Sequence, residues 1–369
     1  MRRTLPALLM LVTAAVLFPA RGPGRFAEAA AAPETLRAAA EQHQLLMGSA
    51  VEARALALEP DYARTLADEY SLVEAENEMK FEAVHPRAGA YDFSRADAIV
   101  AFAESHGMKV RGHNLVWYHD LPRWITEPDS PWTPAQLNQV LSDHIATEVG
   151  HFRGKVYAWD VVNEPFNDDG TLRTSVWFDR PGIGFSGQGT RTIEQALRWA
   201  HAADPDAKLF VNEYGAEGLN AKSDAVYAMA KDFVRRGVPL SGIGLQLHVS
   251  PDFDSVEALG DLQDNVKRLA KLGLEVQFTE VDVRLPDNKG FSLSAQAHLY
   301  GDLLSICLRQ PACTLFETWG FSDRHSWVPG NYRGYGWALP FDADYRRKRA
   351  YTVMLKKLKG RGDRGPRPR

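Results

Sequence analysis

Cysteine is nearly absent from this chain, and so are several features that would indicate particular classes of protein. Only Cys307 and Cys313 occur among the 369 residues, and neither has a Cys or His neighbour at a spacing typical of metal ligands, so no metal site is expected. The formal net charge is only -4, which gives no indication of binding to nucleic acid or to an anionic membrane. No Gly-x-Gly-x-x-Gly motif follows the first predicted strand, which disfavours a dinucleotide site, and we expect no cofactor.

A single long apolar run lies at the N-terminus, from Leu5 to Ala20, and no second stretch approaches membrane-spanning length. Arg2 and Arg3 precede the run, and the small-residue site Ala27-Glu28-Ala29 follows it. This order predicts a signal peptide over residues 1–29, with the cleavage point anywhere between 20 and 32. An uncleaved N-terminal anchor is the alternative. We therefore expect a secreted or periplasmic protein that has no membrane association once the signal is removed.

The remaining composition is typical of an ordinary globular protein, with 45% hydrophobic and 24% charged residues. The catalytic or binding domain is expected over residues 34–359, and the Gly-, Pro- and Arg-rich tail at 360–369 is expected to be disordered. Because an exported protein meets oxidising conditions, Cys307 and Cys313 are expected to form a local disulfide. We expect the protein to act as a monomer.

Short apolar, β-rich runs alternate with helical patterns along the whole chain. The runs are Leu45–Val51, Ser71–Ala75, Lys109–Leu115, Val156–Asn163, Ala207–Asn212, Gly242–His248, Glu275–Val281 and Thr314–Gly320. The helical patterns include Ala96–His106, Pro134–His151, Thr192–Ala203, Asp224–Arg236, Leu259–Leu272 and Leu293–Leu308. Strict alternation predicts parallel strands with helical crossovers, and eight units predict an α/β fold of the (β/α)8 TIM-barrel type. An open doubly wound sheet is the alternative architecture.

Polar residues gather where seven of the predicted strands end, and this is the face that carries the chemistry of such barrels. Hydrolysis of a glycosidic bond needs one carboxylic acid to protonate the leaving oxygen and a second, opposed carboxylate. Glu164 and Glu280 end the fourth and seventh predicted strands and therefore meet at the barrel mouth. Asn163 is placed to hold a sugar hydroxyl, His248 to orient Glu280, and Asp282 to hold that histidine, since Asp282 and Glu280 lie on one face of a strand.

These residues resemble glycoside hydrolase family 10, whose members are chiefly retaining endo-1,4-β-xylanases on a (β/α)8 barrel. The segments that carry the resemblance are Glu76-Asn77-Glu78-Met79-Lys80, Arg111-Gly112-His113-Asn114-Leu115-Val116-Trp117, Trp159-Asp160-Val161-Val162-Asn163-Glu164-Pro165, Gln246-Leu247-His248, Thr279-Glu280-Val281-Asp282 and Trp319-Gly320-Phe321-Ser322-Asp323-Arg324-His325-Ser326-Trp327. The spacing of Cys307 and Cys313 also matches a frequent disulfide of the family. The resemblance extends from about Leu46 to Tyr351.

The resemblance implies a role for each matching position. Glu164 would be the acid/base and Glu280 the nucleophile. Glu76, Asn77 and Lys80 would bind the distal sugar on the glycone side, with Lys80 reaching towards the bond being cut. The sugar beside that bond would be surrounded by His113, Trp117, Asn163, Gln246, His248, Trp319 and Trp327. Tyr214 is expected near the cleft. The implied substrates are xylan and xylo-oligosaccharides.

Two departures from the family pattern stand out. Phe81 occupies a position where Trp is common, and Asn212-Glu213-Tyr214-Gly215 replaces the more usual Asn-Asp-Tyr-Asn. Gly215 removes a side chain on the leaving-group side. Two other functions stay open at this point: a related β-1,4-glucan or β-mannan hydrolase, which should lack the second- and eighth-strand segments seen here, and a catalytically inactive sugar-binding barrel, which would tolerate loss of one carboxylate.

Overall fold

The computed structural model describes residues 34–287 and 292–360. The predicted signal peptide at 1–29 lies outside these residues, as does the tail beyond Gly360. In the described part of the chain, no helix combines the length and the apolar character that crossing a bilayer requires.

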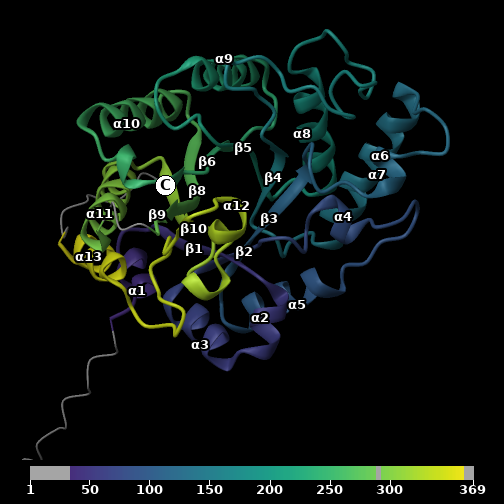
Figure 1. Ribbon diagram of the computed structural model, residues 1–369. Helices are drawn as coiled ribbons and strands as arrows, with labels where there is room; N and C mark the ends of the chain where they lie inside the picture. The colour runs from purple at the N-terminus through teal and green to yellow at the C-terminus, as the bar shows by residue number, and fades with distance from the viewer. Residues whose placement is uncertain (1–33, 288–291, 361–369) are drawn as a thin grey trace, which may run out of the picture. The chain divides into compact units, whose positions relative to one another are not determined.

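A closed ring of parallel strands forms the centre of the fold (Figure 1). The ring strands are β1 (Leu46–Val51), β2 (Leu72–Ala75), β3 (Lys109–Val116), β4 (Ala158–Asn163), β5 (Lys208–Glu213), β6 (Gly242–Leu245), β8 (Glu275–Val283) and β10 (Cys313–Thr318). Three two-residue strands lie outside the ring: β7 (His248–Val249), β9 (Leu285–Pro286) and β11 (Tyr335–Gly336). The ring runs from β1 to β6 and then through β8 and β10, and it closes because β10 pairs with both β8 and β1. The predicted (β/α)8 barrel is confirmed, and the open doubly wound sheet is excluded.

Helices follow the barrel strands and surround them (Figure 1). They are α1 (Leu36–Glu41), α2 (Ala53–Leu58), α3 (Pro60–Glu69), α4 (Phe81–Val84), α5 (Ser94–Ser105), α6 (Arg123–Thr126), α7 (Pro134–His151), α8 (Arg191–Ala203), α9 (Ala221–Arg236), α10 (Val256–Ala270), α11 (Leu293–Arg309), α12 (Val328–Asn331) and α13 (Arg349–Lys359). Local sequence sets their ends. Thr133 and Gln136 form a capping box that starts α7, and Gly237, at φ 66°, ends α9 in the left-handed region.

The sixth predicted strand differs from the expectation. The run from Gly242 to His248 was expected to be one strand, but β6 ends at Leu245 and β7 begins at His248. Leu247 has a φ of 63°, which breaks the strand between them. As a result, His248 pairs beside Asp282 of β8, at the depth where the catalytic chemistry is expected.

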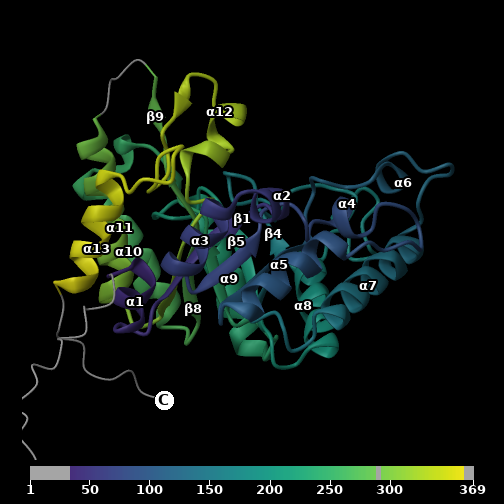
Figure 2. The ribbon, with the colours of Figure 1, turned by 90° about the horizontal axis from the view of Figure 1, so that it is seen from below.

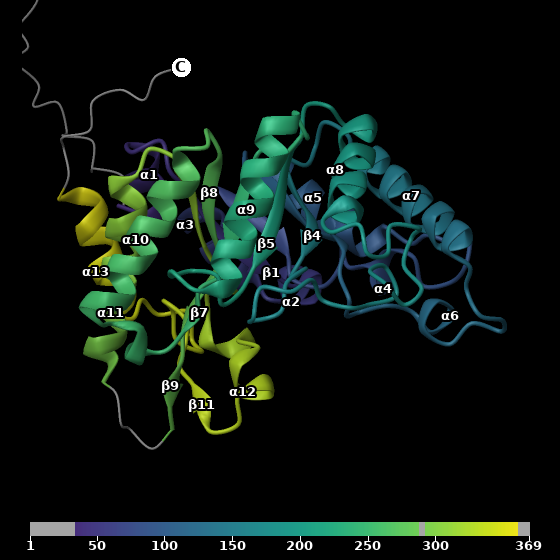
Figure 3. The ribbon, with the colours of Figure 1, turned by 90° about the horizontal axis from the view of Figure 1, so that it is seen from above.

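The segments after β8 and β10 build one side of the barrel mouth. Strands β9 and β11 pair in antiparallel fashion, and Figure 3 places them beside α12, beyond the barrel strands; Figure 2 shows β9 and α12 on the same side. Val328, Ala338 and Leu339 form a small buried core of their own in this region. That core fixes the loop from which Trp327 reaches the cleft.

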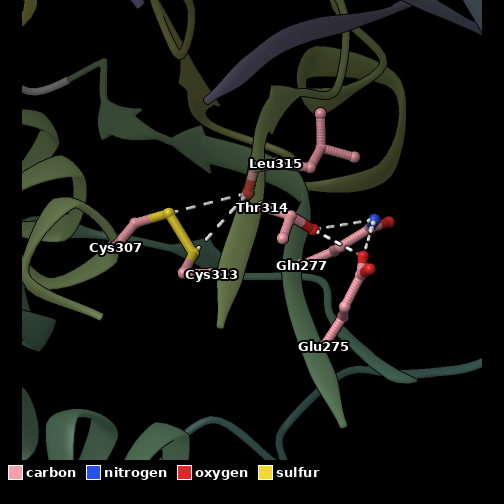
Figure 4. Close-up of a disulfide and its surroundings, with 6 residues drawn as sticks. All are labelled: Glu275, Gln277, Cys307, Cys313, Thr314 and Leu315. Carbon is pink, nitrogen blue, oxygen red and sulfur yellow. Dashed lines mark hydrogen bonds between the residues drawn. A yellow bond between two sulfur atoms is a disulfide. The ribbon is translucent and has the colours of Figure 1, made fainter. Parts of the chain in front are cut away.

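The two cysteines are joined. Cys307 near the end of α11 and Cys313 at the start of β10 form a disulfide that closes a short loop, and both sulfur atoms lie near the carbonyl of Leu315 (Figure 4). The predicted disulfide is confirmed.

Candidate active site

A cleft of about 960 Å³ lies at the C-terminal ends of the barrel strands. It brings together all but one of the residues proposed from the sequence, and these are Glu76, Asn77, Lys80, His113, Trp117, Asn163, Glu164, Tyr214, Gln246, His248, Glu280, Trp319 and Trp327. The exception is Asp282, which is fully buried behind His248.

Glu164 follows directly after β4 and has a backbone conformation that is unusual for its residue type. Its φ is 55°, in the left-handed region, which costs a residue other than glycine about 1–3 kcal/mol. The carboxylate receives two hydrogen bonds from neutral donors: Trp117 Nε1 donates to Oε2 at 3.0 Å and Gln246 Nε2 donates to Oε1 at 3.0 Å. Both donors are uncharged.

Glu280 on β8 has different surroundings. Asn212 Nδ2 donates to its Oε1 at 2.7 Å, and His248 Nε2 lies 2.9 Å from its Oε2. Burial raises the pKa of Glu280, but the hydrogen bond and charge of His248, with smaller contributions from His113 and Asn212, outweigh burial and leave the pKa below its ordinary value. Glu280 is therefore held as a carboxylate.

His248 connects Glu280 to a second carboxylate. Its Nδ1 lies 2.7 Å from Asp282 Oδ2, which also accepts a hydrogen bond of 2.7 Å from Trp327 Nε1. Burial lowers the pKa of His248, but Asp282 and Glu280 outweigh burial and place it well above its ordinary value. The imidazole is therefore a cation that donates to a carboxylate from each nitrogen.

A chain of side-chain amides runs between the two glutamates. Gln246 Nε2, which donates to Glu164, also lies 3.3 Å from Asn163 Oδ1. The same Asn163 oxygen accepts a hydrogen bond of 2.9 Å from Asn212, which in turn donates to Glu280. These hydrogen bonds fix Glu164, directly after β4, relative to Glu280 on β8. Strands β5 and β6 lie between β4 and β8 in the ring.

The loop after β2 forms the other end of the cleft. Lys80 Nζ donates to Asn77 Oδ1 at 2.9 Å, pairs with Asp120 at 3.0 Å, and lies 5.1 Å from the centre of the Trp117 ring. Burial raises the pKa of Glu76 nearby to about 8, although Lys80 acts in the opposite direction. This end of the cleft thus presents both hydrogen-bond donors and acceptors, which suits a sugar with several hydroxyls.

A fully buried charged cluster lies in the barrel interior beneath the cleft. Arg111 pairs with Glu74 at 2.8 Å and also with Asp160, and Asp160 in turn binds His113 Nδ1 at 3.0 Å. Burial raises the pKa values of Glu74 and of its neighbour Glu317 well above the ordinary range. Glu74, His113 and Asp160 have the donor atoms of a metal site, but Arg111 already supplies the positive charge that these carboxylates need.

Several functional residues were missed by the sequence analysis. Asn212 was assigned no role of its own from the sequence, yet its amide contacts both Asn163 and Glu280. Its place directly before Glu213 at a strand end was the available signal. Asn212 itself is fully buried, whereas Tyr118, Asp120, Arg284 and Tyr332 line the cleft. Phe81, the first departure from the family pattern, packs on His144 with ring centres 3.8 Å apart and does not line the cleft.

The comparison with known families agrees with this geometry. A family model described as glycosyl hydrolase family 10 matches residues 35–357. This chain belongs to glycosyl hydrolase family 10. The match covers the whole barrel and both glutamates.

Solved and curated relatives of this family 10 chain are similar along most of their length. Endo-1,4-beta-xylanase B of Thermotoga neapolitana is 41% identical over 306 residues, which covers 81% of this chain and 85% of the relative. The crystal structure of xylanase 10B from Thermotoga petrophila RKU-1 in complex with xylobiose has a TM-score of 0.82 at 41% identity, covering 88% of this chain and 97% of the other. A glycosylated endo-beta-1,4-xylanase from Gloeophyllum trabeum has a TM-score of 0.79 at 32% identity, with 88% and 99% covered.

Proposed function

We propose that this enzyme is an endo-1,4-β-xylanase that hydrolyses xylan with retention of anomeric configuration, with Glu164 as acid/base and Glu280 as nucleophile. The observation that carries the assignment is the contrast between the two carboxyl groups. Glu280 is held ionised by the His248 cation, whereas Glu164 receives hydrogen bonds from neutral donors only. One cleft therefore offers a carboxylate for attack and a separate carboxyl group for proton transfer.

The reaction follows in two steps. Glu164 protonates the leaving glycosidic oxygen while Glu280 attacks the anomeric carbon and forms a glycosyl ester. Glu164, now ionised, removes a proton from water, which attacks the same carbon and releases a product of retained configuration. Asn163 is placed beside both carboxylates through its contacts with Gln246 and Asn212, where its amide can hold the 2-hydroxyl of the sugar undergoing reaction.

The substrate assignment rests on the relatives and on the lining of the cleft. Several similar proteins are named as endo-1,4-β-xylanases, and the similar xylanase 10B was solved with xylobiose. Trp319 and Trp327 both lie near His248, with ring centres 6.2 and 4.6 Å from it, and provide flat apolar surfaces for a pyranose ring. The cleft binds a neutral polymer through hydroxyl contacts and ring faces.

Product analysis tests the substrate and the stereochemistry. Incubation with xylan, cellulose and mannan in parallel should give short xylo-oligosaccharides from xylan, and the first products should carry the β-configuration by NMR. Dominant release from cellulose or mannan would move the chain to a related hydrolase class. Inverted products would overturn the nucleophile assignment.

Substitution of each glutamate tests the roles separately. Glu280→Ala should remove nearly all activity on every substrate, because no carboxylate remains to form the ester. Glu164→Ala should largely keep kcat/KM for aryl xylobiosides with acidic phenol leaving groups and lose kcat/KM on xylan, because only xylan needs protonation of the leaving oxygen in the first step. Equal losses of kcat/KM on both substrates would exclude Glu164 as the acid.

We also propose that the enzyme is exported and acts as a monomer. The support is the charged, apolar and small-residue order at residues 1–29 and the disulfide between Cys307 and Cys313. N-terminal sequencing of the protein recovered outside the cytoplasm should find a start between 20 and 32, and light scattering should give the mass of one chain. A membrane-bound product that retains Arg2 would instead indicate the N-terminal anchor.

A further inference from the structure

Glu164, Pro165 and Phe166 follow directly after β4. Their backbone is held by contacts that take no part in the proposed cleavage of the glycosidic bond. Glu164 has a φ of 55°, and its backbone N–H donates to the Asn212 carbonyl at 2.8 Å. A residue with a side chain adopts this conformation only where its surroundings enforce it. Because the carboxyl group of Glu164 is attached to this backbone, whatever fixes the backbone also fixes the direction of the proposed acid/base.

Arg173, in the loop that follows, is placed to do this. Its Nε donates to the Glu164 carbonyl at 3.1 Å. One of its terminal nitrogens donates to the Phe166 carbonyl at 3.1 Å and to the Tyr214 hydroxyl at 3.0 Å. One guanidinium group therefore holds carbonyls on both sides of Pro165, a geometry that suits the rigid fork of arginine and that the point charge of lysine cannot reproduce.

Glu213 holds the same segment from the other side. Its Oε2 accepts the Phe166 N–H at 3.1 Å, and its Oε1 pairs with Lys222 Nζ at 2.9 Å. Both Glu213 and Lys222 are buried. Phe166 is thus bound through its carbonyl by Arg173 and through its N–H by Glu213, so the turn after Glu164 has little freedom to relax.

Arg173 also reaches the carboxyl end of Glu164 through Tyr118. The guanidinium carbon lies 4.3 Å from the centre of the Tyr118 ring, which lines the cleft. Burial, followed by the neighbouring charge of Glu164, raises the pKa of Tyr118 well above its ordinary range, as expected for a neutral phenol beside that carboxylate. Arg173 therefore supports Glu164 both at its backbone and beside its side chain.

We propose that Arg173 is the positioning residue of the acid/base, with Glu213 as its counterpart across the Phe166 peptide. This inference rests on the proposed role of Glu164. Without Arg173, the strained backbone of Glu164 relaxes, and its carboxyl group turns away from the glycosidic oxygen. The expected defect is a failure of proton donation, while substrate binding and attack by Glu280 continue.

A series of aryl β-xylobiosides with phenols of increasing acidity separates this defect from general damage. For Arg173→Met, kcat/KM should fall about 10-fold or more with poor leaving groups and less than about 3-fold with 2,4-dinitrophenol, because only the former need the acid. Arg173→Lys should lie between Arg173→Met and the unchanged enzyme. Arg198→Lys is the matched control, since Arg198 also donates through its guanidinium, but to Glu194 of its own helix at 3.0 and 2.9 Å.

Two comparisons keep the test decisive. Glu164→Ala, measured on the same series, shows whether Glu164 is the acid at all, and a flat response there would overturn the proposed function itself. If Glu164→Ala responds to leaving-group acidity but Arg173→Met loses the same factor on every substrate, or loses nothing, the positioning role is wrong while the function stands. Circular dichroism melting curves establish that each variant is folded under the assay conditions.

Discussion

His248 is the residue that sets the charge of the proposed nucleophile. It contacts Glu280 at 2.9 Å and Asp282 at 2.7 Å through different ring nitrogens. Only the imidazolium form can donate from both nitrogens at once. The cation lowers the pKa of Glu280 despite burial, so the attacking carboxylate stays ionised at mildly acidic pH.

Replacement of this cation should move the acidic side of the pH profile. Glu280 must be ionised to attack, so activity falls as the pH drops through its pKa. In His248→Gln the charge is lost, the pKa of Glu280 rises, and the acidic limb of kcat/KM should move about one to three pH units upward. The measurement is kcat/KM for 2,4-dinitrophenyl β-xylobioside from pH 3 to 7, since this substrate needs no acid.

His201→Gln serves as the control for this experiment. His201 lies in the last turn of α8 and does not line the cleft, so its loss should leave the limb in place. If the acidic limb of kcat/KM stayed in place or moved to lower pH in His248→Gln, the histidine would not stabilise the Glu280 carboxylate.

At the scale of single residues, the sequence predicted the residues of the cleft only where they lie in a recognisable motif. His248 and Asp282 could be placed because strand alternation puts Glu280 and Asp282 on one face. Arg173 could not be found, because its partners are mainly backbone carbonyls, which every residue has. Its role exists only once β4 and the following loop are folded against each other.

At the scale of elements, the strands were predictable and their irregularities were not. Buried parallel strands appear as continuous apolar runs, and each barrel strand coincides with such a run. The left-handed conformations of Leu247 and Glu164 have no signal in the sequence, because both residue types strongly prefer other regions. Helix α13 is not among the helical patterns named from the sequence, although Tyr351, Met354 and Leu358 are buried at helical spacing. Helix α1 has only six residues, which is too few to show a period.

Strand β6 offers a test of how closely the barrel packs beneath the site. A Cβ added at Gly244 would lie 2.2 Å from Asn212 Oδ1. Gly244→Ala should therefore displace Asn212 from Asn163 and Glu280, lower kcat, and reduce the free energy of unfolding by about 1–3 kcal/mol. Urea unfolding and xylan assays measure the two effects.

Substitution of a second glycine, Gly260, is expected to change the free energy of unfolding in the opposite direction. Gly260 lies within α10 and has open space around its Cβ position. Gly260→Ala should raise the free energy of unfolding by about 0.5–1 kcal/mol and leave kcat unchanged. If Gly244→Ala behaved like Gly260→Ala, Asn212 would not be held in the tight position described.

The disulfide between α11 and β10 is expected to stabilise without affecting catalysis. The cysteines are six positions apart, and closing so small a loop contributes about 2 kcal/mol in the chain-entropy model. Cys307→Ala/Cys313→Ala should lower the free energy of unfolding by this amount and keep kcat/KM on xylan at room temperature. A large loss of kcat/KM in a variant that remains folded would show that β10 itself shifts.

At the scale of the whole molecule, the segments near the two ends of the described chain are in contact. His43, just after α1, contacts the Leu358 carbonyl of α13 at 2.6 Å. Tyr351 of α13 donates to the Glu69 carboxylate, which also accepts the Leu36 N–H at 2.9 Å. Closure of the barrel by β10 and β1 is thus reinforced by a second junction that joins α1, α3 and α13.

Truncation at two points tests where the folded barrel begins. A chain that starts at Glu34 retains the Thr35 cap and the buried Leu36, Ala39 and Ala40 of α1, so its melting temperature and kcat should equal those of the full-length chain. A chain that starts at Gln42 uncovers Tyr351 and Glu69 and should lose about 3 kcal/mol or more of unfolding free energy, because the burial of Leu36 is lost and a cavity remains. If the chain from Glu34 were already destabilised, residues before 34 would belong to the fold; if the chain from Gln42 were as stable as the longer one, the α1–α13 junction would not contribute to barrel closure.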